Sequence, residues 1–159
     1  MAARRQQGSG GPQHANRLDL SFLDGGFYNE QGIRPELLDE KALMLAKRFG
    51  PKGRFDRVSS AQMRKFFGDV RKLEEMMRDD EINLDSDKRE DLRQYPAMIK
   101  MLKSKLAYAA GRKNVSRAFA NTLSRAVDQV ETPRDFKAFI YFFESIMGYY
   151  YGEGGGKLR

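Results

Sequence analysis

Residues 93–125 read RQYPAMIKMLKSKLAYAAGRKNVSRAFANTLSR. Apolar residues recur in this stretch at the spacing of three and four that places side chains on one face of an α-helix. It therefore predicts one helix from Pro96 to about Gly111 and a second, capped by Asn114, that runs to about Val130. The stretch contains no aspartate or glutamate, and its eight positive charges are Arg93, Lys100, Lys103, Lys105, Arg112, Lys113, Arg117 and Arg125.

Three further helices are predicted outside this stretch. One spans residues 35–49, with proline at its first position and Gly-Pro after its end. The next spans 60–80 behind Ser59 and Gln62, which have the spacing of a capping box. The last spans 132–150 and carries a broad aromatic stripe. No segment alternates apolar and polar residues between hairpin turns, so the sequence predicts an all-α fold, a compact bundle of about five helices.

The rest of the chain divides by composition. Residues 1–17 are rich in glycine and glutamine and predict a disordered tail. Residues 18–34 mix glycines with scattered apolar residues and predict an extended segment that docks on the domain or on a partner. The helical bundle is expected over 35–151, with a flexible, glycine-rich end at 152–159. An acidic connection after the second helix is expected to include a short helical piece near Gln94.

Composition excludes several classes of protein. A chain of 159 residues that is 40% hydrophobic fits one domain with one modest core. It has no cysteine and a single histidine, His14, in the tail, so no Ser-His or Cys-His pair and no histidine-bearing metal site is expected. No apolar run approaches the roughly 18 residues of a membrane span, and the N-terminus lacks a secretory signal, which favours a cytoplasmic protein.

The remaining candidates for catalysis are weak. Asp79, Asp80 and Glu81 have the chemistry to hold a hard cation, but a solvated helix end is the commoner role of such a cluster. The tyrosines at 149–151 lack the arginine and histidine neighbours of a tyrosine nucleophile. The loop 50–54 is too short for a phosphate-binding P-loop and follows a helix rather than a strand. We therefore expect no enzymatic activity, no cofactor and no metal.

The net charge of +7 is concentrated in one part of the sequence. Residues 93–125 carry +8, residues 59–92 carry −3, and the other parts lie between −1 and +2. A local field of one sign attracts a polyanion, and phosphate backbones are abundant polyanions in cells. RNA or DNA is therefore the leading class of partner. A merely solvated helix face is the alternative, but such faces mix both signs, as residues 60–80 do.

Four blocks of sequence occur here in the order of a known family. They are ELLDEKA at 36–42, SAQMRKFF at 60–67, MIKMLKSKLAYAAGR at 98–112 and FKAFIYFFESI at 136–146. The third block is the most specific. Through these blocks, over residues 35–150, the chain resembles the small helical subunit of type III-A CRISPR effector complexes, the Csm complexes.

The resemblance implies a five-helix fold and a non-catalytic role in a prokaryotic antiviral ribonucleoprotein. Copies of the subunit are expected to stack along the complex beside repeating backbone subunits, to touch the large polymerase-like subunit, and to line the channel that holds crRNA paired with target RNA. Base pairing reads the sequence, so phosphate and sugar contacts suffice. By position, the implied RNA contacts are Arg64, Lys65, Lys100, Lys103, Lys105, Arg112 and Lys113, with Lys52 and Arg54 as second-rank candidates.

The chain departs from the family at two adjacent positions. Phe67 stands where the family often has tyrosine, and Gly68 stands where a polar helix former is usual. A glycine within a helix costs about 1 kcal/mol relative to alanine, which predicts close packing or a kink at Gly68. Two other functions stay open: a free-standing DNA-binding regulator that uses the helices around 112–125 as a helix-turn-helix, and a structural bridge whose basic face is incidental.

Overall fold

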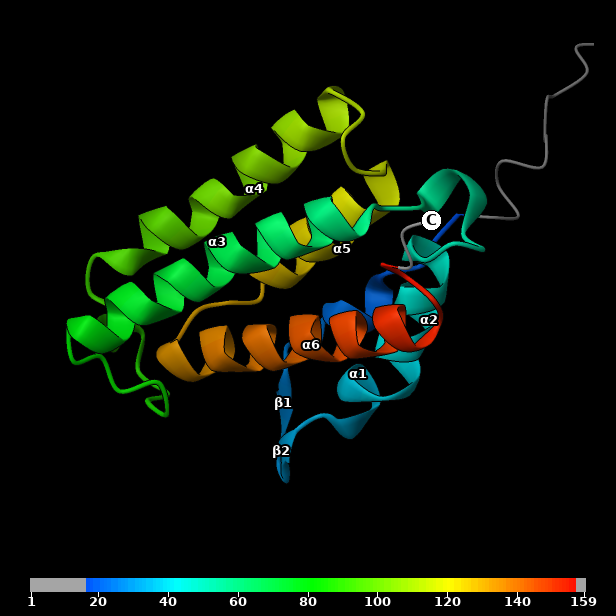
Figure 1. The fold of residues 1–159 in the computed structure, drawn as a ribbon. Coiled ribbons are helices and arrows are strands. Elements are labelled where there is room, and N and C mark those ends of the chain that lie inside the picture. Colours follow the sequence, from blue (N-terminus) through cyan, green and yellow to red (C-terminus); the bar gives the residue numbers. More distant parts are fainter. Residues whose placement is uncertain (1–16, 157–159) are drawn as a thin grey trace, which may run out of the picture.

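The computed structural model describes residues 17–156, which form a helical bundle (Figure 1). This confirms the predicted all-α fold of five helices, because α1 and α2 together are the helix expected over 35–49 and are separated by Asp39 alone. The predicted tail lies outside the described residues except for Arg17. The strands and α-helices are β1 (Tyr28–Asn29), β2 (Gly32–Ile33), α1 (Pro35–Leu38), α2 (Glu40–Phe49), α3 (Ser60–Asp79), α4 (Tyr95–Gly111), α5 (Arg117–Val127) and α6 (Pro133–Gly152). Short 3₁₀ helices span Ser21–Leu23, Arg54–Asp56 and Arg89–Leu92, and the last of these is the short helical piece expected in the acidic connection.

The core forms around α6, which packs against α1, α2 and α3. Rings from four helices meet at Phe119 of α5: the centroids of Phe49, Phe66 and Phe143 lie 5.4, 6.0 and 6.3 Å from its own, all edge to face. Such T-shaped pairs are a favoured aromatic geometry. The aromatic stripe expected on the last helix is buried as predicted, through Phe136, Phe139, Phe143, Ile146 and Tyr150.

Side-chain caps begin two of the helices where the sequence places them. Ser59 Oγ accepts a hydrogen bond from the backbone N–H of Gln62 at 3.2 Å, at the start of α3. Thr132 and Asp135 form a reciprocal capping box at the start of α6. Each such bond satisfies an N–H that the first helical turn leaves without a partner.

The start of α5 differs from the prediction. Ser116, not Asn114, is the cap, and its Oγ accepts from the N–H of Phe119 at 3.2 Å. Asn114 belongs instead to the turn that ends α4, where Lys113 adopts a φ of 61° and the N–H of Asn114 donates to the carbonyl oxygen of Ala109. This is the hydrogen-bond pattern of a Schellman motif, which closes the end of a helix.

Residues 18–34 pack on the bundle. Leu23 and Phe27 are buried in the core. The hydroxyl of Tyr28 donates to the carbonyl oxygen of Arg134 at 2.7 Å, and the Arg134 guanidinium lies 4.2 Å from the centre of the Tyr28 ring. The sequence predicted no strands, whereas β1 and β2 form a small antiparallel hairpin. Two residues per strand are too few to show the alternation on which a strand prediction depends.

The antiparallel course of α3 and α4 gives the molecule two distinct ends (Figure 1). Residues 80–94 connect these helices at one end. The α2–α3 loop, the α4–α5 turn and the end of α6 gather at the other. The 20 residues of α3 separate the two ends by about 30 Å. Among residues 17–156, no helix combines the length and the apolarity that crossing a membrane requires.

Candidate nucleic-acid interface

Two of the predicted RNA-binding lysines share a carboxylate. Lys100 and Lys103 of α4 lie with their Nζ atoms 3.5 and 2.6 Å from Oδ1 of Asp128, just after α5. Partial burial acts to raise the pKa of the Asp128 carboxyl, but the hydrogen bonds and charges of the two lysines outweigh it and hold the pKa below its ordinary value. Part of the positive charge of α4 is therefore balanced within the chain.

Two arginines of the stretch 93–125 are also engaged within the chain. Arg125 forms an ion pair with Asp24 at 2.7 Å, which ties α5 to the N-terminal segment. Arg93 donates to the carbonyl oxygen of Asp80 at 2.7 Å. Four of the eight cations in this stretch thus contact carboxylate or carbonyl oxygens of the protein itself.

The other four cations are Lys105, Arg112, Lys113 and Arg117, at the end of α4 and the start of α5. All four are exposed, and within residues 17–156 none of them takes part in an ion pair. The Arg112 guanidinium lies 5.7 Å from the centre of the exposed Tyr108 ring and donates to its hydroxyl at 3.3 Å. An aromatic face orients a cation without neutralising it.

The α2–α3 loop brings three more exposed cations to the same end of the molecule: Lys52, Arg54 and Arg57. Ser116 Oγ, at the start of α5, donates to the carbonyl oxygen of Asp56 at 2.8 Å and so ties this loop to the α4–α5 turn. The loop and the turn therefore present one surface. We call its cations the basic end, and they are Lys52, Arg54, Arg57, Arg112, Lys113 and Arg117.

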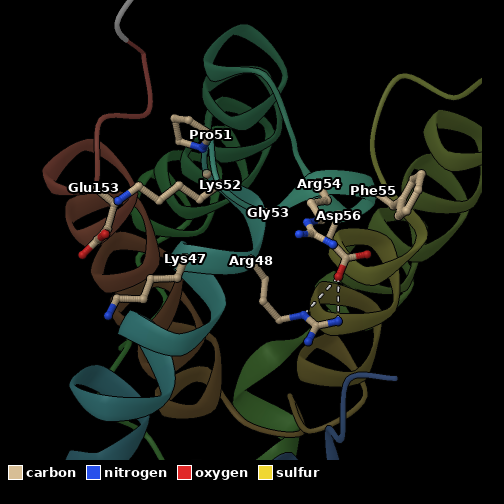
Figure 2. Close-up of a pocket in the computed structure, with 10 residues that line it drawn as sticks. Lys47, Arg48, Pro51, Lys52, Gly53, Arg54, Phe55, Asp56 and Glu153 are labelled. Atoms are coloured by element: carbon tan, nitrogen blue, oxygen red, sulfur yellow. Dashed lines mark hydrogen bonds and ion pairs between the residues drawn. The ribbon is translucent and has the colours of Figure 1, made fainter. Parts of the chain in front are cut away.

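A hollow of about 760 Å³ opens between the end of α2 and this loop (Figure 2). Lys47, Lys52 and Glu153 lie on one side of it, and Arg48 and Asp56 lie on the other. Arg48 donates through Nε and Nη2 to one oxygen of Asp56, at 3.0 and 2.7 Å. Because this pair neutralises the acid of the loop, the surroundings of the hollow keep a surplus of positive charge that suits an anion.

Sequence reasoning missed Phe55, whose side chain is 97% exposed. Figure 2 shows its ring on the side of the turn away from Lys47 and Glu153. The signal was present, because Phe55 stands between Arg54 and Arg57 in a loop with no apolar periodicity to direct it into the core. An aromatic residue among cations outside any amphipathic pattern is a candidate for a binding contact.

Arg64 and Lys65 are exposed near the start of α3, the helix that follows the loop of the basic end. Arg64 lines a second hollow of about 400 Å³ together with Tyr150 and Gly155. The structure thus ties the loop of Lys52 and Arg54 to the turn of Arg112 and Lys113, with Lys52 on the side of Glu153 (Figure 2). Lys105 lies about two turns earlier on α4, and Lys100 and Lys103 lie further along it beside Asp128.

The acidic residues at the opposite end make structural contacts. The hydroxyl of Tyr95 donates to the carboxylate of Asp80, and this bond raises the pKa of Tyr95 to about 12. Lys137 donates to Asp85, which lowers the pKa of the Asp85 carboxyl. In the part of the chain that the structure describes, no group of three or more histidine, cysteine or acidic side chains could hold a metal ion.

Comparison with known proteins identifies the family. The family model described as Csm2 Type III-A matches residues 34–155, which contain the α-helices α1 to α6, the basic end and the hollow beside Phe55. No curated protein and no solved structure matches the chain. Because the match covers most of the sequence, the chain belongs to the Csm2 Type III-A family and is a small subunit of a type III-A CRISPR complex.

Proposed function

We propose that this subunit is non-catalytic and binds the sugar-phosphate backbone of crRNA paired with target RNA, in the prokaryotic cytoplasm. The observation that carries the proposal is the segregation of charge. The six exposed cations of the basic end, none of which takes part in an ion pair within residues 17–156, gather where the α2–α3 loop meets the α4–α5 turn, and Arg48 neutralises the one acid of that loop. Lys100, Lys103 and Arg125, which have acidic partners, lie elsewhere.

A backbone contact suits these side chains better than reading of bases. Paired RNA has a deep, narrow major groove that side chains cannot read, whereas its phosphates and 2′-hydroxyls are exposed. Long, exposed lysines and arginines on a loop and a turn can reach such phosphates, and each contact releases counterions from the RNA. Sequence recognition is then left to base pairing between the two RNA strands.

We also propose that copies of the subunit stack end to end beside the repeating backbone subunits and reach the large polymerase-like subunit. The charges of the two ends support the stacking. Residues 79–92 contain seven acids and two cations, whereas residues 50–57 contain three cations and one acid and residues 111–117 contain three cations and no acid. Opposite charges at opposite ends attract when identical molecules are placed head to tail.

The test compares two double variants in the reconstituted complex. Lys113→Gln with Arg117→Gln removes two cations of the basic end. Lys100→Gln with Lys103→Gln, the matched control, removes the same charge from the pair held by Asp128. The affinity for target RNA is measured over a series of salt concentrations, with two unrelated guide and target sequences.

Removal of Lys113 and Arg117 should reduce the slope of log affinity against log salt by about 2, because each lost phosphate contact contributes about one unit. The control should change the slope much less, and the two sequences should behave alike. Equal slopes in the wild type and both variants would contradict RNA binding by the basic end.

The DNA-binding regulator has less support. A recognition helix needs an exposed face for a groove of DNA, whereas six of the eleven residues of α5 are buried. Arg125, one of its exposed residues, is paired with Asp24. A strong preference of the purified chain for one duplex DNA sequence would nevertheless favour the regulator.

A further inference from the structure

Phe55 is the most exposed large apolar side chain in residues 17–156. Its exposed fraction is 97%, against 65% for Tyr108, the next in order. A phenyl ring kept in water forgoes the favourable free energy of burial. Aromatic side chains beside positively charged surfaces are the groups on which proteins stack the bases of single-stranded nucleic acids. The ring also borders the hollow that Lys47, Lys52 and Arg54 line.

The turn that carries Phe55 is held in place on both sides. Before it, Gly53 packs so closely that a Cβ atom there would lie 1.7 Å from the carbonyl oxygen of Arg48. After it, Asp56 accepts from Arg48 through its carboxylate and from Ser116 through its carbonyl oxygen. The ring is thus presented by a constrained turn, and a preorganised contact loses less entropy when it binds.

Cations stand on both sides of this ring in the sequence. Arg54 precedes it and Arg57 follows two residues later, and Arg57 Nε donates to the carbonyl oxygen of Arg54 at 3.1 Å. Asp56, the acid of the turn, is neutralised by Arg48. If Phe55 entered an apolar pocket of another protein, the neighbouring arginines would lose their hydration, which costs free energy. The cores of protein–protein interfaces are depleted in charged residues for that reason. A nucleotide offers a flat base to the ring and a phosphate to the cations.

We propose that Phe55 stacks on the face of an unpaired nucleobase while Arg54 contacts the adjoining phosphate. The inference rests on the proposed function and adds a single-stranded nucleotide to its ligands. In paired RNA the base faces are covered by their neighbours, so a side-chain ring reaches one only at an unpaired or terminal nucleotide. Every base has a π face, so the contact requires no particular sequence.

A fluorescent variant tests the stacking directly. The chain contains no tryptophan, so Phe55→Trp in the full-length protein introduces a single indole. A single-stranded RNA oligonucleotide should quench its emission, because a stacked base lies against the ring. The same RNA annealed to its complement should quench it much less. Equal quenching by the two forms, or none by either, would overturn the stacking.

Three substitutions separate a stacking ring from an apolar anchor. Phe55→Ala should lower the affinity for single-stranded RNA roughly 5- to 150-fold and leave the salt slope unchanged, because it removes a base contact and no phosphate contact. Phe55→Tyr keeps the π face and should bind as the wild type does. Phe55→Leu keeps an apolar side chain without the π face, so its affinity for single-stranded RNA should fall as that of Phe55→Ala does. Wild-type affinity in Phe55→Leu would overturn the proposal.

Measurements of RNA affinity in the reconstituted complex distinguish a failure of the stacking proposal from a failure of the proposed function. The reference is the Lys113→Gln and Arg117→Gln double variant. If the double variant loses RNA affinity and Phe55→Ala does not, the stacking is wrong and the backbone contact stands. If neither loses affinity, both are wrong. If Phe55→Ala instead loses other subunits at unchanged RNA affinity, the ring contacts protein and the stacking is wrong. The expected result is weaker RNA binding in a complex of full composition.

Discussion

At the scale of single residues, two glycines have opposite surroundings. A Cβ atom at Gly53 would lie 1.7 Å from the carbonyl oxygen of Arg48, whereas one at Gly68 would meet no atom within 4 Å. Of the two alternatives predicted for Gly68, close packing is therefore wrong, and the kink stays a prediction. The glycine of the loop is required by a backbone contact, and the glycine of α3 only weakens a helix.

These surroundings predict stability changes of opposite sign. Gly53→Ala should lower the free energy of unfolding by about 1–3 kcal/mol, because the backbone of Arg48 must move to admit the methyl group. Gly68→Ala should raise it by about 1 kcal/mol, because alanine is the better helix former. Denaturant unfolding of both variants at neutral pH measures the two changes. A change of the same sign in both would contradict this account.

The raised pKa of Tyr95 predicts that the stability of the fold depends on pH in the alkaline range. The bond that it donates to Asp80 raises the pKa of its hydroxyl from the ordinary 10.0 to about 12 in the folded protein. The fold therefore favours the neutral phenol, so this contribution to stability is full below pH 10 and is lost as the pH rises from 10 to 12. The absorbance of phenolate should show a component that titrates near pH 12 in the folded protein.

Two variants identify that component. Tyr95→Phe should remove it and reduce the fall in stability between pH 10 and 12. Asp80→Asn removes the charge of the acceptor and should return the pKa of Tyr95 toward its ordinary value. A titration curve of Tyr95→Phe that keeps the late component would show that another tyrosine produces it.

The sequence identifies the cations of the site but does not predict which of them form ion pairs with acidic residues of the chain. Asp128 lies 25 residues from Lys103, and Asp24 lies 101 residues from Arg125. Such pairs exist only once the helices have packed, so no local pattern reveals them. For the same reason, sequence analysis placed Lys103 beside Lys113 as equal candidates, and the structure separates them.

At the scale of elements, local signals predicted the helices well and their exact starts less well. Pro35 and the box of Thr132 with Asp135 act over one turn of helix, so the sequence alone reveals them. The choice between Asn114 and Ser116 as a cap depends on distant contacts. Both residue types cap helices well, and the structure selects Ser116 while its hydroxyl also donates to the backbone of Asp56, 60 residues away.

The end of α4 predicts a variant in which stability and binding change in opposite directions. Lys113 adopts a φ of 61°, a conformation that costs a side-chain-bearing residue about 1–2 kcal/mol and glycine almost nothing. Lys113→Gly should therefore raise the free energy of unfolding by about 1 kcal/mol. It should also lower the salt slope of RNA binding by about 1, because it removes one cation of the basic end.

The matched control for that variant is Lys113→Gln. It removes the same charge and keeps a side chain at the strained position, so it should lower the salt slope equally without raising the stability. Thermal unfolding and salt-dependent RNA binding of both variants provide the comparison. Weaker binding in Lys113→Gly together with lower stability would mean that the turn has been disrupted, and would contradict the relief of strain.

At the scale of the whole molecule, the bundle separates its charges along α3. The acidic connection at residues 79–92 lies at one end of that helix and the basic end lies at the other (Figure 1). Composition reveals the two blocks of charge, but only the antiparallel course of α3 and α4 places them at opposite ends. A molecule with this arrangement presents an acidic surface to the basic end of the next copy in a head-to-tail stack.

The stacking proposal predicts the behaviour of two charge-reversed proteins and of their mixture. Variant one carries Glu81→Lys, Asp87→Lys and Glu90→Lys, which change the charge of residues 79–92 from −5 to +1, so both of its ends are positive. Variant two carries Arg112→Glu, Lys113→Glu and Arg117→Glu, which change the summed charge of residues 50–57 and 111–117 from +5 to −1, so both of its ends are negative. Each variant alone should associate less than the wild type at low salt, because like charges meet in every head-to-tail contact. An equimolar mixture should associate again, since opposite charges then meet at every contact between the two variants.

Sedimentation velocity at several salt concentrations measures this association, and the association recovered in the mixture should weaken as salt screens the charges. A mixture that associates no more than its components would show that the charged ends do not hold the copies together.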